Sequence, residues 1–135
     1  WVNPLGIAYF QAFTNTYAPL PVLREKFETA LNYPRIVGLS IATRADCLAD
    51  DVCEYLAELA ERTFLTVELG LQTVHDSTAE FINRGHTFAE FIDGFEKLRA
   101  ASPKINICVH LIDGLPGEDA GMMLETARQT ASIHP

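Results

Sequence analysis

The sequence predicts an α/β fold with a parallel sheet and helices outside it. Four short apolar runs lack the alternation of polar and apolar residues, which is typical of strands buried on both faces of a parallel sheet. The segments between these runs carry apolar residues at helical spacing. Strands and helices that alternate in this way are typical of consecutive βα units joined by right-handed crossovers. We therefore expect four βα units in a single domain that spans residues 1–135.

The apolar runs give the expected strands, which are residues 6–10, 36–41, 64–71 and 105–112. The first two helices are predicted by apolar residues at positions i, i+4, i+7 and i+8. These are Leu23, Phe27, Ala30 and Leu31 in the first helix, and Val52, Leu56, Leu59 and Ala60 in the second. The last helix is expected to begin at Glu118 or Asp119 and to continue through Met122, Met123 and Ala127.

Two capping boxes divide the third connection into two helices. Ser77 is followed three residues later by Glu80. Thr87 is followed by Glu90 at the same spacing, at which the two side chains satisfy free backbone amides at a helix start. We expect a short helix that begins at Ser77 and that Gly85 ends, and a longer one that begins at Thr87. The longer helix has an apolar stripe formed by Phe88, Phe91, Ile92, Phe95 and Leu98.

Two architectures contain such units, an open doubly wound sheet and a (β/α) barrel. A Rossmann sheet has a Gly-x-Gly-x-x-Gly turn after its first strand, where glycines let a pyrophosphate approach a helix N-terminus. The residues after the first expected strand lack that pattern. We therefore expect a piece of a TIM-like (β/α) barrel, with a flavodoxin-like or Rossmann sheet as the alternative.

Composition excludes several classes of function. The chain has 135 residues, of which 48% are hydrophobic, so it can bury one core and is not typical of disorder. Its formal net charge of −8 argues against a general nucleic-acid surface, because such surfaces bind phosphates through Lys and Arg. No run approaches the roughly 18 apolar residues of a membrane span and no signal peptide is recognisable, so we expect a cytoplasmic protein. The start at Trp1 and the end at Pro135 are expected of a piece of a longer protein.

Polar residues follow each expected strand. In parallel α/β folds, ligands bind beyond the C-terminal ends of the strands. The residues at these positions are Gln11, Thr14, Asn15 and Tyr17 after the first strand, Thr43, Arg44 and Asp46 after the second, Gln72, Thr73 and His75 after the third, and His110, Asp113 and Gly114 after the fourth. Strand ends are polar in any α/β protein, which is the competing interpretation of each residue alone. The set predicts one site at this edge of the sheet.

Three motifs carry a resemblance to a known family. They are Val-Glu-Leu-Gly-Leu-Gln-Thr at 67–73, Ile-Asn-Arg-Gly-His at 82–86 and Leu-Ile-Asp-Gly-Leu-Pro-Gly-Glu at 111–118. They resemble the back half of the barrel of radical SAM enzymes, in the bacterial branch related to oxygen-independent coproporphyrinogen oxidases and to the elongator catalytic subunit. The resemblance covers nearly the whole chain. It implies a partial barrel from an enzyme that uses S-adenosyl-L-methionine (SAM) and a [4Fe-4S] cluster.

The resemblance assigns SAM-binding roles to the last two strand ends. It implies that Gln72 hydrogen-bonds the SAM ribose and that Arg84 meets the SAM carboxylate, which a guanidinium can bind bidentately. His110 stands where the coproporphyrinogen oxidases have an acidic residue that contacts the ribose. Gly114 and Pro116 belong to a turn expected near the adenine, where glycine permits close approach of the backbone. The alternative roles are capping of the next helix by Gln72 and a surface ion pair at Arg84.

The first two strand ends resemble the family less closely. Gln11 and Ala12 stand where many members have a Gly-Gly pair whose backbone meets the methionyl amino group. Thr43 and Arg44 match a Glu-Thr-Arg-Pro-Asp turn of the family. Ala42, however, stands where several relatives have an acidic residue that holds the methionine end of SAM. We expect Gln11, Thr43 and Arg44 to contribute to the SAM pocket.

The cysteines do not form the cluster-binding motif of the family. That motif is Cys-x3-Cys-x2-Cys, and Cys47, Cys53 and Cys108 have other spacings. The resemblance therefore implies that the ligands of the [4Fe-4S] cluster lie outside this chain. Cys53 and Cys108 are expected to fill apolar space, and Cys47 is expected to be an exposed thiol. An odd number of cysteines without framework spacing predicts reduced thiols.

Other titratable residues give weaker predictions. The histidines have neither the spacing of a metal pair nor a cluster, so no zinc site is expected. Glu68 lies in an expected buried strand, and Arg35 or Arg44 is expected to pair with its charge. No Ser-His-Asp order or catalytic pair of carboxylates stands out.

The resemblance implies a function for the intact enzyme. Reduction by one electron cleaves SAM to methionine and a 5′-deoxyadenosyl radical, which abstracts hydrogen from the substrate. This chain is expected to supply part of the SAM pocket and to be inactive alone, with an RNA, a protein or a small molecule as the substrate. The alternatives are another parallel α/β enzyme domain that binds a phosphate or nucleotide, and a non-catalytic interaction module. A slice of a barrel has two free sheet edges, so we expect either self-association through an edge strand or coverage of the edges by loops.

Overall fold

The chain forms one parallel sheet of four strands. The computed structural model describes residues 4–135, and Trp1 lies outside them. The strands are β1 (Gly6–Phe10), β2 (Ile36–Thr43), β3 (Phe64–Gln72) and β4 (Asn106–Leu111). They pair in the order β1-β2-β3-β4, and every pairing is parallel. This confirms the predicted α/β fold and the four strands. β2 and β3 extend slightly beyond the apolar runs that predicted them.

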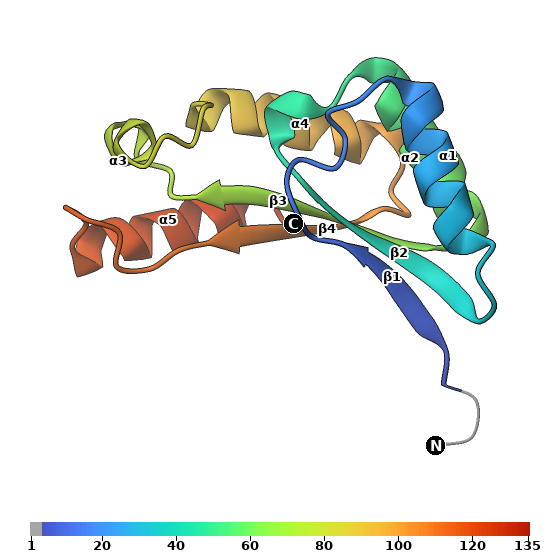
Figure 1. Cartoon of the computed structure of the whole chain (residues 1–135). Coiled ribbons are helices and arrows are strands. Elements are labelled where there is room, and N and C mark those ends of the chain that lie inside the picture. The colour runs from blue at the N-terminus through green and yellow to red at the C-terminus, as the bar shows by residue number, and fades with distance from the viewer. Residues whose placement is uncertain (1–3) are drawn as a thin grey trace.

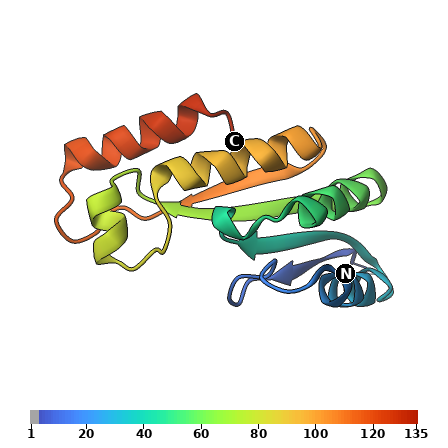
Figure 2. The same cartoon turned by 90° about the horizontal axis from the view of Figure 1, so that it is seen from above.

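Four of the five helices lie on one face of the sheet (Figure 1). They are α1 (Leu20–Leu31), α2 (Asp50–Arg62), α3 (Asp76–Phe81), α4 (Phe88–Ala101) and α5 (Ala120–Ser132), and a 3₁₀ turn, η1 (Ala45–Cys47), follows β2. Helices α1 to α4 cover the same face of the sheet, while α5 lies along the edge formed by β4 (Figures 1 and 2). Within the described part of the chain, no helix is long and apolar enough to cross a membrane.

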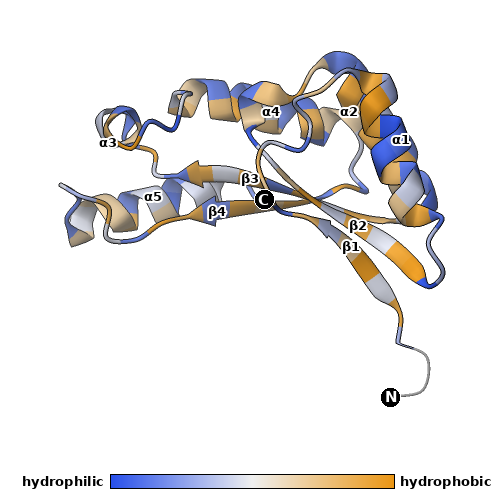
Figure 3. Cartoon of the chain, viewed as in Figure 1, coloured by the Kyte–Doolittle hydropathy of each residue, from blue (hydrophilic) through white to orange (hydrophobic). Residues whose placement is uncertain are grey.

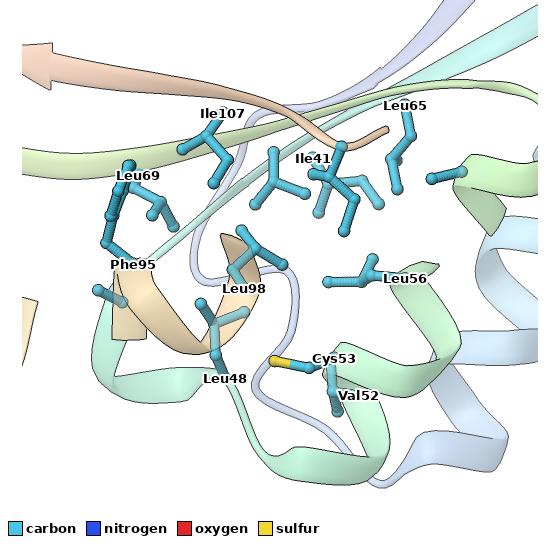
Figure 4. Close-up of a cluster of buried hydrophobic side chains, with 14 of the residues drawn as sticks. Ile41, Leu48, Val52, Cys53, Leu56, Leu65, Leu69, Phe95, Leu98 and Ile107 are labelled. Carbon is cyan, nitrogen blue, oxygen red and sulfur yellow. The ribbon is translucent and has the colours of Figure 1, made fainter. Parts of the chain in front are cut away.

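The hydrophobic core lies between the sheet and its helices. Alternate residues of β3, from Leu65 to Leu71, are at most 1% exposed and point to the helices. They meet Leu56 of α2 and the Phe95 and Leu98 side chains of α4, which close the core from the other side (Figure 4). The helices carry hydrophilic residues away from this layer (Figure 3). Burial of these apolar side chains is the main contribution that holds the helices on the sheet.

The other face of the sheet is uncovered by helices of residues 4–135 (Figure 1). The prediction that the strands are buried on both faces is therefore wrong. Ile7 and Tyr9 of β1 are each 49% exposed on this face, and the alternate positions of β3 are only partly buried. The uncovered positions of β3 and β4 include Thr66, Glu68 and His110, so these two runs do alternate between polar and apolar residues. Such alternation is typical of a sheet with only one covered face.

The third connection contains both predicted helices, but only one predicted capping box. Thr87 Oγ1 accepts a hydrogen bond from Glu90 N, and the Glu90 side chain accepts one from Thr87 N, which confirms the box of α4. The box at Ser77 is wrong, because α3 begins at Asp76 and has no side-chain cap. Asp76 Oδ1 instead accepts from the backbone amide of Phe88 at 2.7 Å, and so joins α3 to α4.

The end of α3 also differs from its prediction. Asn83, with a φ of 54°, takes the left-handed position that was assigned to Gly85. The amide of Arg84 then donates to the carbonyl of Ala79 at 2.9 Å, which is the bond of a Schellman motif. Gly85 has a φ of 87° and lies in the loop beyond. For α5, the predicted start is confirmed, because Asp119 accepts a hydrogen bond from Met122 N.

Candidate functional site

A single cavity lies beyond the C-terminal ends of the four strands. Its volume is about 560 Å³, and every strand contributes to its wall. The lining residues are Tyr9, Gln11, Phe13, Thr14, Ala42, Thr43, Arg44, Glu68, Gly70, Gln72, Ile82, Arg84, His86, His110, Ile112 and Leu115. Six of the residues predicted to bind SAM are therefore together, namely Gln11, Thr43, Arg44, Gln72, Arg84 and His110. Gly114 and Pro116 do not line the cavity, although Leu115 between them does.

Gln72 occupies an unusual backbone conformation at the end of β3. Its φ is 67°, in the left-handed region that a residue with a side chain rarely adopts. The pairing of β3 with β4 shifts between Gly70 and Gln72, which marks a bulge. The Gln72 amide lies over Gly70, where a Cβ atom would come within 2.7 Å of Gln72 Nε2. Gly70 thus makes room for the amide in the cavity wall. Gln72 does not cap α3, whose start has no side-chain cap.

Arg84 is buried and its guanidinium is bound to the protein. Nη1 donates to the carbonyls of Leu71 and Thr73 at 2.7 and 2.5 Å, and Nε donates to the carbonyl of His86 at 2.8 Å. Nη2 lies 3.4 Å from Asp76 Oδ1. The Arg84 side chain is only 3% exposed, so the alternative of a surface ion pair does not apply. Burial lowers the pKa of Arg84.

Arg44 and His86 lie next to Arg84 in the wall. Arg44 donates to Asp46 through Nε and Nη2 at 2.9 and 2.6 Å, and Nη2 also reaches the carbonyl of Gly85 at 3.1 Å. The His86 side chain is 1% exposed, and within residues 4–135 neither ring nitrogen has a hydrogen-bond partner. Burial, followed by the charge of Arg84, lowers the pKa of His86. Buried polar atoms of this kind usually have partners.

His86 was not identified from the sequence as a site residue. Its motif was noticed, but a histidine in a loop gives no local signal of burial. For Asp46, burial is the largest influence and raises the pKa of the carboxyl group, but the hydrogen bonds and the charge of Arg44, with smaller contributions from His86 and the backbone, together lower it. The Arg44 side chain is 39% exposed, so it meets both the cavity and solvent.

A polar cluster crosses the uncovered face of the sheet, with one residue from each strand. Glu68 of β3 accepts hydrogen bonds from Tyr9 Oη of β1 at 2.8 Å and from Ser40 Oγ of β2 at 2.5 Å. Its Oε2 atom also lies 3.0 Å from His110 Nε2 of β4. Burial opposes the charge of Glu68, yet Ser40, Tyr9 and His110 together lower its pKa. The cluster therefore stabilises a carboxylate at the floor of the cavity.

The predicted partners of Glu68 are wrong. Arg35 donates to the carbonyl of Pro4, and Arg44 pairs with Asp46. Side chains alternate between the two faces of a strand. Glu68 lies on the uncovered face of β3, beside Tyr9 of β1 and Ser40 of β2, and not at a strand end. An arginine that precedes or follows a strand lies too far along it to reach this position.

The loop after β1 is held by Asn15. Its Nδ2 atom donates to the carbonyls of Phe10 at 2.8 Å and Ala42 at 3.0 Å, and its Oδ1 accepts from Lys26 Nζ at 2.6 Å. Thr43 Oγ1 lies 2.5 Å from the hydroxyl of Thr16, which joins the same loop to the end of β2. These bonds fix the backbone that presents Gln11 to the cavity. Tyr17 lies outside the cavity wall and is 82% exposed.

The other predicted strand-end residues connect β3 to α5. Thr73 Oγ1 donates to Glu118 Oε1 at 2.5 Å, and His75 Nε2 lies 3.1 Å from the carbonyl of Met122. Gly114 has a φ of 78°, and nothing within 4 Å would meet a Cβ atom there. The turn is therefore anchored through Glu118 while its glycine faces open space.

The structure corrects two of the predictions about the exposure of the cysteines. Cys53 is 3% exposed in the core, as predicted (Figure 4). Cys108, which was expected to fill apolar space, is exposed on the uncovered face, and Cys47 is half-buried rather than exposed. Burial raises the pKa of the Cys47 thiol. Within residues 4–135, no group of three His, Cys, Asp or Glu residues is arranged to hold a metal ion.

Known proteins share this sequence and this fold. Protein YtqA of Bacillus subtilis is 59% identical over 133 residues, which are 98% of this chain and 41% of YtqA. The tRNA uridine(34) acetyltransferase of Methanocaldococcus jannaschii is 34% identical over 88 residues, which are 65% of this chain and 15% of that protein. The structure of Methanocaldococcus infernus Elp3 with an N-terminal deletion superposes with a TM-score of 0.60 at 25% identity, over 70% of this chain and 21% of Elp3.

The chain thus spans about two-fifths of YtqA, the first of these relatives. The likeness to Elp3 agrees with a partial TIM-like barrel, which the four parallel strands and their covering helices form here. Enzymes that modify tRNA are among its relatives. The sequence model of the Radical SAM superfamily matches residues 6–130, and the chain belongs to that superfamily.

Proposed function

We propose that this chain is the SAM-binding portion of a radical SAM enzyme. The observation that carries the proposal is the cavity of about 560 Å³ at the strand ends, in which polar residues of all four βα units meet. Domain 1–135 would be one slice of a barrel, completed by strands from the rest of the protein. β1 and β4 are the outer strands of the sheet within residues 4–135, and α5 lies beside β4 (Figure 2). Their edges are the places where strands from the rest of the protein, or a second copy of this chain, would pair. The activity belongs to the longer protein, and the chain alone is inactive.

The donors and acceptors in the wall fit the groups of SAM. Arg44 Nη1, which has no hydrogen-bond partner in residues 4–135, suits the methionyl carboxylate. The Gln72 amide has donors and an acceptor for the vicinal hydroxyls of ribose, and His110 lies on the neighbouring strand. Gln11 and Thr43 lie at the first two strand ends. They would meet the methionyl end of SAM. Gly114 and Pro116 belong to the turn proposed to lie near the adenine.

The residues of this chain would bind and orient the cofactor. SAM and a [4Fe-4S] cluster supply reductive carbon–sulfur cleavage and hydrogen abstraction in this superfamily. The three cysteines here do not have the cluster-binding spacing, so the rest of the protein would hold the cluster. Arg44 would fix the methionyl end, and Gln72 the ribose. The apolar residues Ile82 and Ile112 in the wall would limit access of water.

A tRNA is the substrate we propose for the longer protein. The support is the name of the Methanocaldococcus jannaschii relative, which is an acetyltransferase of tRNA uridine 34. The formal net charge of −8 on this chain disfavours contact with phosphates. The rest of the protein would therefore bind the RNA backbone, while this cavity receives only the cofactor and the reacting nucleoside.

The test is SAM affinity, measured by calorimetry on the full-length protein after anaerobic reconstitution of its cluster. Gln72→Ala and Arg44→Ala should each weaken SAM binding by roughly tenfold, the effect of one lost charge-assisted or well-placed hydrogen bond. The control is Arg128→Ala on α5, whose side chain is 71% exposed, and it should leave the affinity unchanged. If the wild-type protein does not bind SAM, or if both variants bind it as tightly as wild type, the assignment of this cavity is wrong.

A further inference from the structure

Gln72 and Arg84 are linked through the backbone. Gln72 has a φ of 67°, a conformation that is strained for any residue with a side chain and that persists only where neighbours impose it. The φ of Gln72 decides where its amide points, because a change to an ordinary φ would turn the side chain out of the cavity. The neighbours that impose this conformation are therefore part of the binding site.

Arg84 contacts the chain on both sides of Gln72. Its Nη1 donates to the carbonyl of Leu71 at 2.7 Å and to the carbonyl of Thr73 at 2.5 Å. These are the residues directly before and after Gln72. Its Nε donates to the carbonyl of His86 at 2.8 Å, which ties the loop after α3 to the same point. In an ordinary strand the carbonyls of residues two apart point the same way but lie about 6.6 Å apart. Here the amide of Thr73 donates to the carbonyl of Leu71 at 2.8 Å, which closes a turn over Gln72, and one nitrogen of the buried guanidinium bridges both carbonyls of this turn.

We propose that Arg84 is a positioning residue that holds Gln72 in its left-handed conformation, and so aims the Gln72 amide at the ligand, instead of binding the SAM carboxylate itself. This inference rests on the proposed function of the cavity as a SAM site. It assigns the carboxylate to Arg44, the other arginine in the wall.

The donors of the two arginines support this division. A guanidinium has five N–H groups. In Arg84, Nε and both hydrogens of Nη1 are bound to carbonyls, and Nη2 faces Asp76. In Arg44, Nε and Nη2 are bound but Nη1 has no hydrogen-bond partner in residues 4–135. The side chain of Arg84 is 3% exposed and that of Arg44 is 39% exposed, so Arg44 is the arginine that a ligand can reach.

Lysine cannot reproduce this arrangement. Its ammonium is a single point, whereas the rigid guanidinium plane serves the carbonyls of Leu71 and Thr73 through one nitrogen and that of His86 through another. Arg84→Lys therefore keeps the positive charge but loses part of the contact with the backbone around Gln72. A purely electrostatic role would tolerate this substitution better than a positioning role.

The experiment compares two probes on the full-length protein, SAM and 5′-deoxyadenosine, which lacks the methionyl carboxylate. Arg84→Lys should weaken both by a similar factor, roughly tenfold, because Gln72 serves the ribose that both share. In a Gln72→Ala background, the same substitution should change either affinity by less than about threefold, since residues that act together are not additive. The matched control, Arg44→Lys, should weaken SAM and spare 5′-deoxyadenosine.

Two results would overturn the inference. One is that Arg84→Lys weakens SAM alone, which would place Arg84 on the carboxylate. The other is that the effects of Arg84→Lys and Gln72→Ala on 5′-deoxyadenosine affinity multiply in full, which would make them independent.

Folding gives a second readout that does not depend on SAM. Glycine adopts a positive φ without strain, so Gln72→Gly should restore much of the thermal stability that Arg84→Lys removes. The control is Gln72→Ala, which keeps a Cβ atom and should restore none. If Gln72→Gly gives no rescue, Arg84 does not hold this conformation. If the wild-type protein binds neither probe, the proposed function fails, and the rescue alone decides the role of Arg84.

Discussion

Gly94 is the position at which a single added methyl group should disturb both the fold and the site. It lies on α4, where the helix packs against η1. A Cβ atom at this position would lie 2.2 Å from the carbonyl oxygen of Ala45, 2.7 Å from its carbonyl carbon and 3.0 Å from its Cβ. Two of these three atoms belong to the backbone, so a change of rotamer gives no relief. Gly94→Ala must therefore move α4 away from η1.

The expected loss of stability combines two opposing effects. To reach ordinary van der Waals contact, α4 and η1 must separate by roughly 1 Å, and overpacking of this kind destabilises by about 1–3 kcal/mol. Alanine is favoured over glycine within a helix by about 1 kcal/mol. Because the clash is with backbone, we take the upper part of the first range, which leaves a net loss of about 2 kcal/mol. The affinity for SAM should also fall, since Ala45 follows Arg44 directly.

Urea denaturation, followed by circular dichroism, measures the free energy of unfolding of each variant. Glu96 is an exposed residue of the same helix, so the difference between Glu96→Ala and Glu96→Gly reports the helix preference alone. We expect Glu96→Ala to be more stable than Glu96→Gly by about 1 kcal/mol. If Gly94→Ala proved as stable as wild type while the Glu96 pair behaved as expected, the close packing of α4 on η1 would be refuted.

Three further predictions concern other parts of the chain. The folded pKa of Glu68 lies below its usual value of 4.5, so the stabilising effect of its charge is present above that value and is lost as the pH falls through the folded pKa. Glu68→Gln should therefore unfold at a lower urea concentration than wild type at pH 7, and this difference should narrow in acid; a constant difference contradicts the assignment. Thr87→Ala should lower the stability by about 1 kcal/mol in the same assay, whereas Ser77→Ala should have little effect, because only Thr87 caps a helix. Labelling with iodoacetamide and peptide mass spectrometry should find Cys108 modified first and Cys53 only after unfolding, and early modification of Cys53 would show that the core is open.

The order and type of the elements could be predicted because their signals are local. Apolar runs and helical periods locate the strands and helices within a few residues, and the Thr87 box locates the start of α4. The Ser77 box has the same residue pattern but no cap forms there. Instead α3 begins one residue earlier, at Asp76, whose carboxylate accepts a hydrogen bond from the amide of Phe88. This contact joins two helices, so the local pattern at Ser77 does not report it.

The site was predictable in its position and less so in its contacts. Strand ends of a parallel sheet meet at one edge, which is why Gln11, Gln72 and His110 could be grouped from the sequence. The partners of Glu68 could not be predicted, because they depend on the register of β1, β2 and β4 and on which face each side chain takes.

The sequence by itself determined the α/β class, the four parallel strands, the edge of the sheet that carries the cavity and the resemblance to the radical SAM superfamily. These properties follow from periodicity, from chain direction and from short motifs. Only the tertiary structure decided that the helices of residues 4–135 leave one face of the sheet uncovered (Figure 1), that the ring nitrogens of His86 are buried without hydrogen bonds to these residues, and that Arg84 is bound to the backbone around Gln72. The physical reason is that hydrogen bonds and burial are properties of the space between segments. A sequence motif identifies a side chain, but the surroundings of that side chain in the fold decide which of its donors a ligand can reach.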